Sequence, residues 1–121
     1  MILNASRNTT VSQKPFHAVR LWDRTRGMIG RDFGASFDAM VFSACNAIHT
    51  FFMQIPLDVI FLNRENVVVS LRRSLRPWYP CVLSWRSCTV VELPVGAIDA
   101  SATEVGDRFI FDPGKCDLMS N

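Results

Sequence analysis

The sequence predicts a mostly β (α+β) fold: a compact antiparallel β-barrel-like single domain with one packed amphipathic helix. Short runs rich in β-branched and aromatic residues recur along the chain between polar breaks, which is typical of antiparallel strands. One segment shows the apolar spacing of a surface helix. The most apolar run, residues 49–62, is interrupted by Pro56 and Asp58 and is too short to span a membrane as a helix.

The helix is predicted over residues 15–28. Proline is favoured in a first helical turn, and Phe16, Val19 and Trp22 follow Pro15 at a spacing of three. A β-hairpin is expected between residues 57–62 and 67–71, because the polar residues 63–66 separate these two apolar runs. The strands are predicted at residues 38–43, 48–54, 57–62, 67–71, 87–93 and 108–111.

The composition is that of one globular domain. The chain has 121 residues, of which 49% are hydrophobic and 20% charged, enough to bury a core. We expect residues 1–14 to form a flexible N-terminal segment, residues 15–112 the domain, and residues 113–121 a frayed tail. Because the chain shows neither a signal-peptide pattern nor a segment of transmembrane length, we expect a cytoplasmic protein without a membrane span.

Several short motifs follow one another in an order that is known from other proteins. They are residues 26–31 (RGMIGR), 45–50 (CNAIHT), 51–53 (FFM), 56–62 (PLDVIFL), 91–96 (VELPVG) and 106–107 (GD). This series resembles the family called domain of unknown function 192, and residues 45–50 resemble its CNSIHT branch. The resemblance implies a compact β-rich domain but no reaction, catalytic residue or cofactor, because the family is uncharacterised.

The same resemblance bears on location and role. Many relatives carry a secretion signal or a lipid anchor, and we expect neither in this chain. Some relatives of the CNSIHT branch are encoded beside pilus-assembly or secretion genes, which implies an accessory role.

Cys45 and His49 are the first candidates for chemistry. Both residue types bind metals such as zinc, and an offset of four can place them on one side of a turn. They could instead form a nucleophile and its base. The simplest alternative is a buried thiol beside a histidine that hydrogen-bonds to the backbone. No spaced second pair completes a closed zinc site, so no metal or cofactor is assigned.

Asp58 and Glu92 are carboxylates within apolar strands. An ionised carboxylate in such a place requires a partner or an edge position. Arg26 and Arg31 flank the glycine-rich end of the predicted helix and are the partners that we expect. The four residues are predicted to form a structural ion-pair network, or to line a pocket for a small polar or anionic ligand.

A third candidate is the segment in which arginines and aromatics alternate. Arg76, Trp78, Tyr79 and the nearby Trp85 have the composition of an interface anchor. Stacking platforms for single-stranded nucleic acid share this composition, but the formal net charge of only +2 argues against such a partner. The simplest alternative is a tryptophan packed on the domain beside solvated arginines.

These observations favour a non-enzymatic binding or accessory module over an enzyme. Its site is expected at the carboxylate–arginine pocket or at the aromatic–arginine segment, and its partner would be a protein or a small polar or anionic ligand. The alternative is a small enzyme or metal-binding protein that uses Cys45 and His49. The sequence does not define the oligomeric state.

Overall fold

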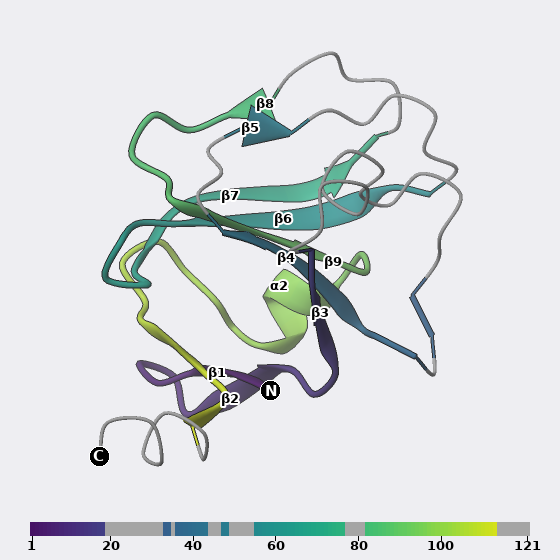
Figure 1. Cartoon of the computed structure of the whole chain (residues 1–121), viewed down its shortest axis with the longest axis horizontal. Coiled ribbons are helices and arrows are strands. Elements are labelled where there is room, and N and C mark those ends of the chain that lie inside the picture. Colours follow the sequence, from purple (N-terminus) through teal and green to yellow (C-terminus); the bar gives the residue numbers. More distant parts are fainter. Residues whose placement is uncertain (19–32, 35, 44–46, 49–54, 77–81, 114–121) are drawn as a thin grey trace.

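A computed structural model describes residues 1–18, 33–34, 36–43, 47–48, 55–76 and 82–113 (Figure 1). Ten strands and one short helix lie in this part of the chain. They are β1 (Ile2–Asn4), β2 (Thr9–Ser12), β3 (Pro15–His17), β4 (Ala39–Ser43), β5 (Ala47–Ile48), β6 (Leu57–Leu62), β7 (Val68–Leu75), β8 (Val82–Leu83), β9 (Thr89–Leu93), α2 (Ala97–Ala100) and β10 (Phe109–Phe111).

The main sheet has five strands in the order β3-β4-β9-β6-β7. Neighbouring strands are antiparallel except β3 and β4, which run parallel. β6 lies inside this sheet and all six of its residues are buried. Its nearly continuous apolar sequence is therefore the pattern of a strand covered on both faces.

Each face of the main sheet carries a hydrophobic cluster. The helix-side cluster includes Ile98 of α2, and its members are Ile2, Ala39, Val41, Ile60, Leu62, Val68, Val91, Leu93, Ile98 and Phe109. The far-side cluster lies on the opposite face, and its members are Ala18, Met40, Phe42, Leu57, Val59, Phe61, Leu75 and Val90. Successive residues of a strand alternate between these clusters because side chains point to opposite faces of a sheet.

Two smaller sheets lie on opposite sides of the main sheet (Figure 1). The three-stranded sheet β10-β1-β2 lies on the side of α2, while the β5–β8 pair lies on the other side. The mostly β, α+β class and the single domain are confirmed. The described strands form open sheets and no closed barrel, so the barrel-like arrangement is not seen among them.

Two expectations differ from the structure at the N-terminus. Residues 15–17, expected to begin a helix, form β3, in which Phe16 pairs with Met40; residues 19–28 lie outside the described part. Residues 1–14, expected to be flexible, contain β1 and β2. β1 pairs with β2 and β10 and buries Ile2 in the core, and this burial holds the segment in place.

Other expected elements are found close to their predicted positions. Strands β4, β6, β9 and β10 are confirmed, and β7 is longer than expected because it continues to Leu75. The predicted hairpin is formed by β6 and β7. Most of residues 48–54 and of the tail lie outside the described residues.

Candidate functional site

Asp58 is held by backbone groups from two distant segments. Its side chain is 2% exposed. Oδ1 accepts a hydrogen bond from the Ser74 N–H at 2.9 Å, and Oδ2 accepts from the N–H groups of Gly96 at 3.1 Å and Ile98 at 3.0 Å. A carboxylate that accepts several N–H bonds is well compensated for its burial. Asp58 therefore joins β7 to the first turn of α2.

The local backbone explains why these N–H groups are available. Leu57 pairs with Leu75 and Val59 with Arg72, so two residues of β7 face Asp58 alone, which is a β-bulge. Ser74 within the bulge has a φ of 50°. Gly96 precedes α2 with a φ of 96°, a conformation that glycine adopts without strain. Both segments leave N–H groups without ladder partners, and Asp58 accepts from them.

Glu92 lies at the centre of the main sheet with its side chain in an apolar environment. It pairs with Met40 on one side and Val59 on the other, and both belong to the far-side cluster. The residue is 3% exposed, and its Oε2 has no hydrogen-bond partner within the described part of the chain. Burial raises the pKa of Glu92 to about 8. The carboxyl is therefore largely protonated at neutral pH.

The sheet itself separates the two carboxyls. Asp58 reaches α2, on the helix side, whereas Glu92 faces the far side with Met40 and Val59. The two groups cannot act on the same bound molecule from one face. The predicted partners Arg26 and Arg31 lie outside the described residues, so pairing of either arginine with Glu92 or Asp58 stays a prediction.

One described arginine shares the face of Glu92. Directly paired residues point to the same side of a sheet, and Val59 pairs with both Glu92 and Arg72. Arg72 is exposed on the edge strand β7. On the opposite side of Glu92, Met40 pairs with Phe16 of β3. A row across the sheet thus places an exposed cation, a buried carboxyl and apolar side chains on one face.

The predicted aromatic–arginine segment is divided in the structure. Arg76 follows β7 at the end of the main sheet where Leu75 pairs with Leu57. Trp85 lies in a turn closed by the Ser87 N–H and the Ser84 carbonyl, beside the opposite end of β6. The ends of β6 are about 17 Å apart. Trp78 and Tyr79 lie outside the described residues, and their role stays a prediction.

Trp85 is 83% exposed, the largest exposed fraction among the large apolar side chains that the structure describes. The tryptophan is therefore not packed on the described part of the domain. Tryptophan is among the residues enriched at the energetic centres of protein interfaces. Cys45 and His49 lie outside the described residues, and the described residues contain no group of three His, Cys, Asp or Glu side chains that could hold a metal ion.

A third buried carboxyl group, that of Asp107, was not predicted as a site from the sequence. Asp107 accepts hydrogen bonds from the Asn4 side chain at 2.9 Å, the Glu104 N–H at 2.9 Å and the Arg7 guanidinium. Burial alone would raise the pKa of Asp107, but the bonds from Asn4, Glu104 and Arg7 outweigh it and lower the pKa. The only sequence signal was the Gly106–Asp107 turn. This cluster ties the β1–β2 hairpin to the segment before β10.

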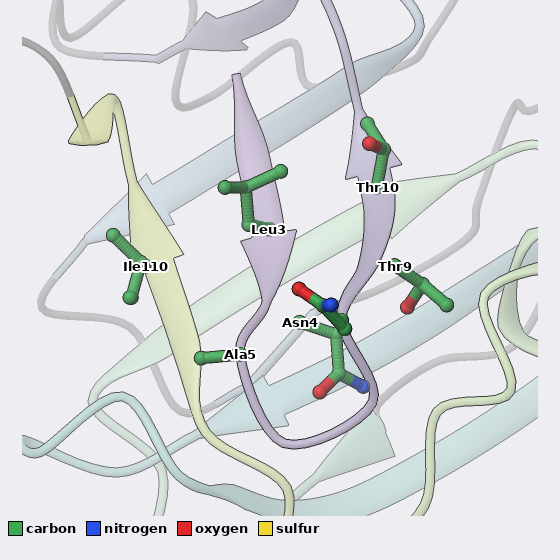
Figure 2. A pocket seen from close by; sticks show the side chains of 7 residues that line it. Leu3, Asn4, Ala5, Thr9, Thr10 and Ile110 are labelled. Atoms are coloured by element: carbon green, nitrogen blue, oxygen red, sulfur yellow. The ribbon is translucent and has the colours of Figure 1, made fainter.

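A shallow hollow of about 330 Å³ lies on the outer surface of the three-stranded sheet (Figure 2). Figure 2 shows the side chains of Leu3 and Ile110 on neighbouring strands beside Thr10. The lining residues are Leu3, Asn4, Ala5, Asn8, Thr9, Thr10 and Ile110. None of them has an ionisable side chain, so the residues that line this hollow supply no acid or base.

Comparison with known proteins identifies the family. The sequence profile of domain of unknown function 192 (DUF192), described as "Uncharacterized ACR, COG1430", matches residues 5–111. The chain belongs to this family. Two of the motifs that suggested the DUF192 family, residues 56–62 and 91–96, meet in space, because Asp58 accepts a hydrogen bond from the Gly96 N–H.

Curated DUF192 relatives carry the name UPF0127 protein. The chain is 44% identical to such proteins from Thermococcus sibiricus and Pyrococcus furiosus over 62 residues, which are 51% of this chain. The match spans 40% and 53% of the two relatives, about half of their length or less. None of the described helices is long and apolar enough to cross a membrane.

Two solved structures share the fold. A protein of unknown function from Novosphingobium aromaticivorans superposes with a TM-score of 0.70 at 17% identity, covering 80% of this chain and 74% of the other. A Sinorhizobium meliloti protein described as a "putative transcription regulator" gives 0.75 at 21% identity, covering 90% and 88%. These likenesses show the fold alone.

Proposed function

We propose that this DUF192 chain is a small non-enzymatic binding module whose ligand is a small organic anion with an apolar body. The observation that carries the proposal is the Glu92 carboxyl, buried at the centre of the main sheet with an Oε2 that has no partner among the described residues. Buried polar groups in native proteins nearly always have a partner, so an unpartnered one calls for an explanation. A bound ligand supplies the missing hydrogen bond.

The protonation state of Glu92 selects the chemistry of the ligand. Because burial raises its pKa to about 8, the carboxyl is a hydrogen-bond donor at neutral pH. A carboxylate or phosphate oxygen is the acceptor that forms the strongest bond with such a donor. Arg72 lies on the same face, two strands away, at a backbone distance of about 10 Å. Its charge attracts an anion to this face.

The surrounding side chains favour a ligand with an apolar part. Phe16, Met40 and Val59 share the row of Glu92 on the far side of the sheet. Phe33 and Phe37, whose rings pack edge to face with centroids 5.9 Å apart, also border the far-side cluster. Contact with these groups would stabilise an aliphatic or aromatic carboxylate more than an inorganic anion.

The geometry favours binding over acid–base catalysis. Asp58 is on the other face of the sheet and its two oxygens already accept three backbone N–H groups. It does not provide a second acid or base for a ligand at Glu92. A binding module also suits the accessory role in pilus assembly or secretion that the sequence resemblance implies. Chemistry at Cys45 and His49 stays an alternative prediction.

The proposal is tested by titrating the full chain with acetate, butyrate, hexanoate and hexylammonium, followed by backbone amide NMR. We expect the affinity to rise with chain length for the carboxylates and hexylammonium to bind much more weakly. Glu92→Gln keeps a donor and should stay within a few-fold of the wild type. Glu92→Leu removes the donor and should weaken hexanoate binding about tenfold or more.

Matched arginine variants provide the control. Arg72→Ala should weaken hexanoate binding, whereas Arg73→Ala should not, because Arg73 pairs with Asp99. Wild-type affinity should also fall as the pH rises through about 8, the pKa of Glu92, and this fall should be absent in Glu92→Gln. Stronger binding of hexylammonium than of hexanoate, or an unchanged affinity in Glu92→Leu, would contradict the proposal.

A further inference from the structure

A second surface lies at one end of the main sheet, away from the Glu92 row. Two turns meet there, residues 63–66 between β6 and β7 and residues 84–87 before β9 (Figure 1, left). The Cys88 N–H donates to the Leu62 carbonyl at 2.7 Å, which fixes the second turn beside the end of β6. We call this end of the molecule the turn surface.

The segment before β10 completes the turn surface. Val67 forms an isolated bridge with Arg108, and the Phe109 N–H donates to the Asn66 carbonyl at 2.8 Å. Segments from three distant parts of the sequence are therefore held together by backbone hydrogen bonds. Such a scaffold presents side chains with little loss of backbone entropy on binding.

This surface combines an exposed aromatic side chain with several exposed cations. Trp85 is 83% exposed, and the arginines of the same three segments, Arg64, Arg86 and Arg108, are exposed as well. No carboxylate among the described residues forms an ion pair with these three arginines, whereas Arg7 and Arg73 elsewhere are paired. Glu65 is the single acidic residue of the two turns, and the acidic residues of the third segment, Glu104 and Asp107, pair with Arg7.

We propose that the turn surface docks an acidic segment of a partner protein, with Trp85 entering an apolar socket and the arginines pairing with partner carboxylates. Tryptophan and arginine are the residues most enriched at the energetic centres of protein interfaces. Arginine binds carboxylates through two parallel hydrogen bonds, and three exposed arginines on one surface complement a run of Asp or Glu. This assignment groups Trp85 with Arg64, Arg86 and Arg108 instead of with Arg76.

The test begins with short random peptides displayed on phage and selected on the immobilised full chain. We expect the selected peptides to be enriched in Asp and Glu together with apolar residues. Synthetic copies, labelled with a fluorophore, are then titrated in solution. Trp85→Ala, and separately the triple alanine variant of Arg64, Arg86 and Arg108, should each weaken binding about tenfold or more.

Three controls make the result specific. Arg73→Ala, at an exposed arginine of β7 that lies outside the turn surface and pairs with Asp99, should leave the affinity unchanged. The melting temperature of Trp85→Ala should match that of the wild type, because the side chain is exposed. Labelled oligothymidine should bind weakly or not at all.

The proposal is overturned if the selected peptides carry no excess of acidic residues, or if Arg73→Ala weakens peptide binding as much as the triple variant does. It is also overturned if oligothymidine binds more tightly than the peptides and loses affinity in Trp85→Ala, because the surface would then be a stacking platform for nucleic acid.

Discussion

Replacing Glu92 by glutamine should change how the stability of this protein depends on pH. Glu92 is buried and its pKa is raised from 4.5 to about 8 by burial. Between these two values the unfolded chain releases a proton that the folded chain retains. The free energy of unfolding therefore falls as the pH rises through this window, because the unfolded state binds fewer protons.

The magnitude follows from the size of the shift. One proton of difference corresponds to about 1.4 kcal/mol per pH unit, so the fall over the whole window is on the order of 5 kcal/mol. Glutamine keeps the shape of the side chain and does not ionise. Glu92→Gln should lack this fall, resemble the wild type near about pH 5, and be several kcal/mol more stable near about pH 8.

The assay is urea unfolding at a series of pH values, with the free energy extrapolated to water. Glu65→Gln is the matched control, since Glu65 is exposed in the β6–β7 turn and its replacement should leave the pH dependence unchanged. Parallel curves for the wild type and Glu92→Gln would show that Glu92 is ionised when buried, and would refute the reasoning.

Three further predictions concern the backbone and the other carboxylates, each measured by urea unfolding. Asp58→Asn places an amide donor among three backbone N–H donors and should lower the free energy of unfolding by about 3–5 kcal/mol. Asp99 is exposed, so the control Asp99→Asn should change the free energy of unfolding by less than about 1 kcal/mol. Gly96→Ala meets open space but holds a φ of 96°, so it should destabilise by about 1–2 kcal/mol; Gly34→Ala, also in open space, is the control without a positive φ. The pKa of Asp107 is lower in the folded chain than its ordinary value of 3.8, so the ionised carboxylate stabilises the fold. This stabilisation is present above pH 3.8 and is lost as the pH falls through the lower pKa of the folded state. Asp107→Asn should remove this acid-induced loss of stability.

Strand positions could be predicted from local composition, and the exceptions have local causes. β6 was evident because its residues are apolar in succession. The spacing of Phe16, Val19 and Trp22 predicted a helix from residue 15, but residues 15–17 form β3. Because β3 is an edge strand, the missing N–H of Pro15 removes no necessary ladder bond. Residues 19–28 lie outside the described residues, so the rest of that helix stays a prediction. With only three apolar positions, spacing alone does not distinguish the start of a helix from an edge strand.

The sites depended on contacts between distant parts of the chain. Asp58 stood out as a carboxylate in an apolar strand, but its partners are backbone N–H groups 16, 38 and 40 residues away, which no side-chain pattern reveals. Likewise, the sequence did not define the register that places Glu92 opposite Met40 and Val59. Trp85 and Arg76 are nine positions apart in the sequence, yet they lie near opposite ends of β6.

The pairing of β1 with β10 has a consequence for synthesis on the ribosome. Ile2 pairs with Phe111, and both Ile2 and Phe109 belong to the helix-side cluster. A nascent chain holds its first strand without this partner until nearly all of the described sequence has been translated. Ile2 then stays incompletely covered during elongation, and such exposed apolar surface is a target for chaperones and aggregation. The late emergence of β10 thus sets the moment at which this domain can complete its core.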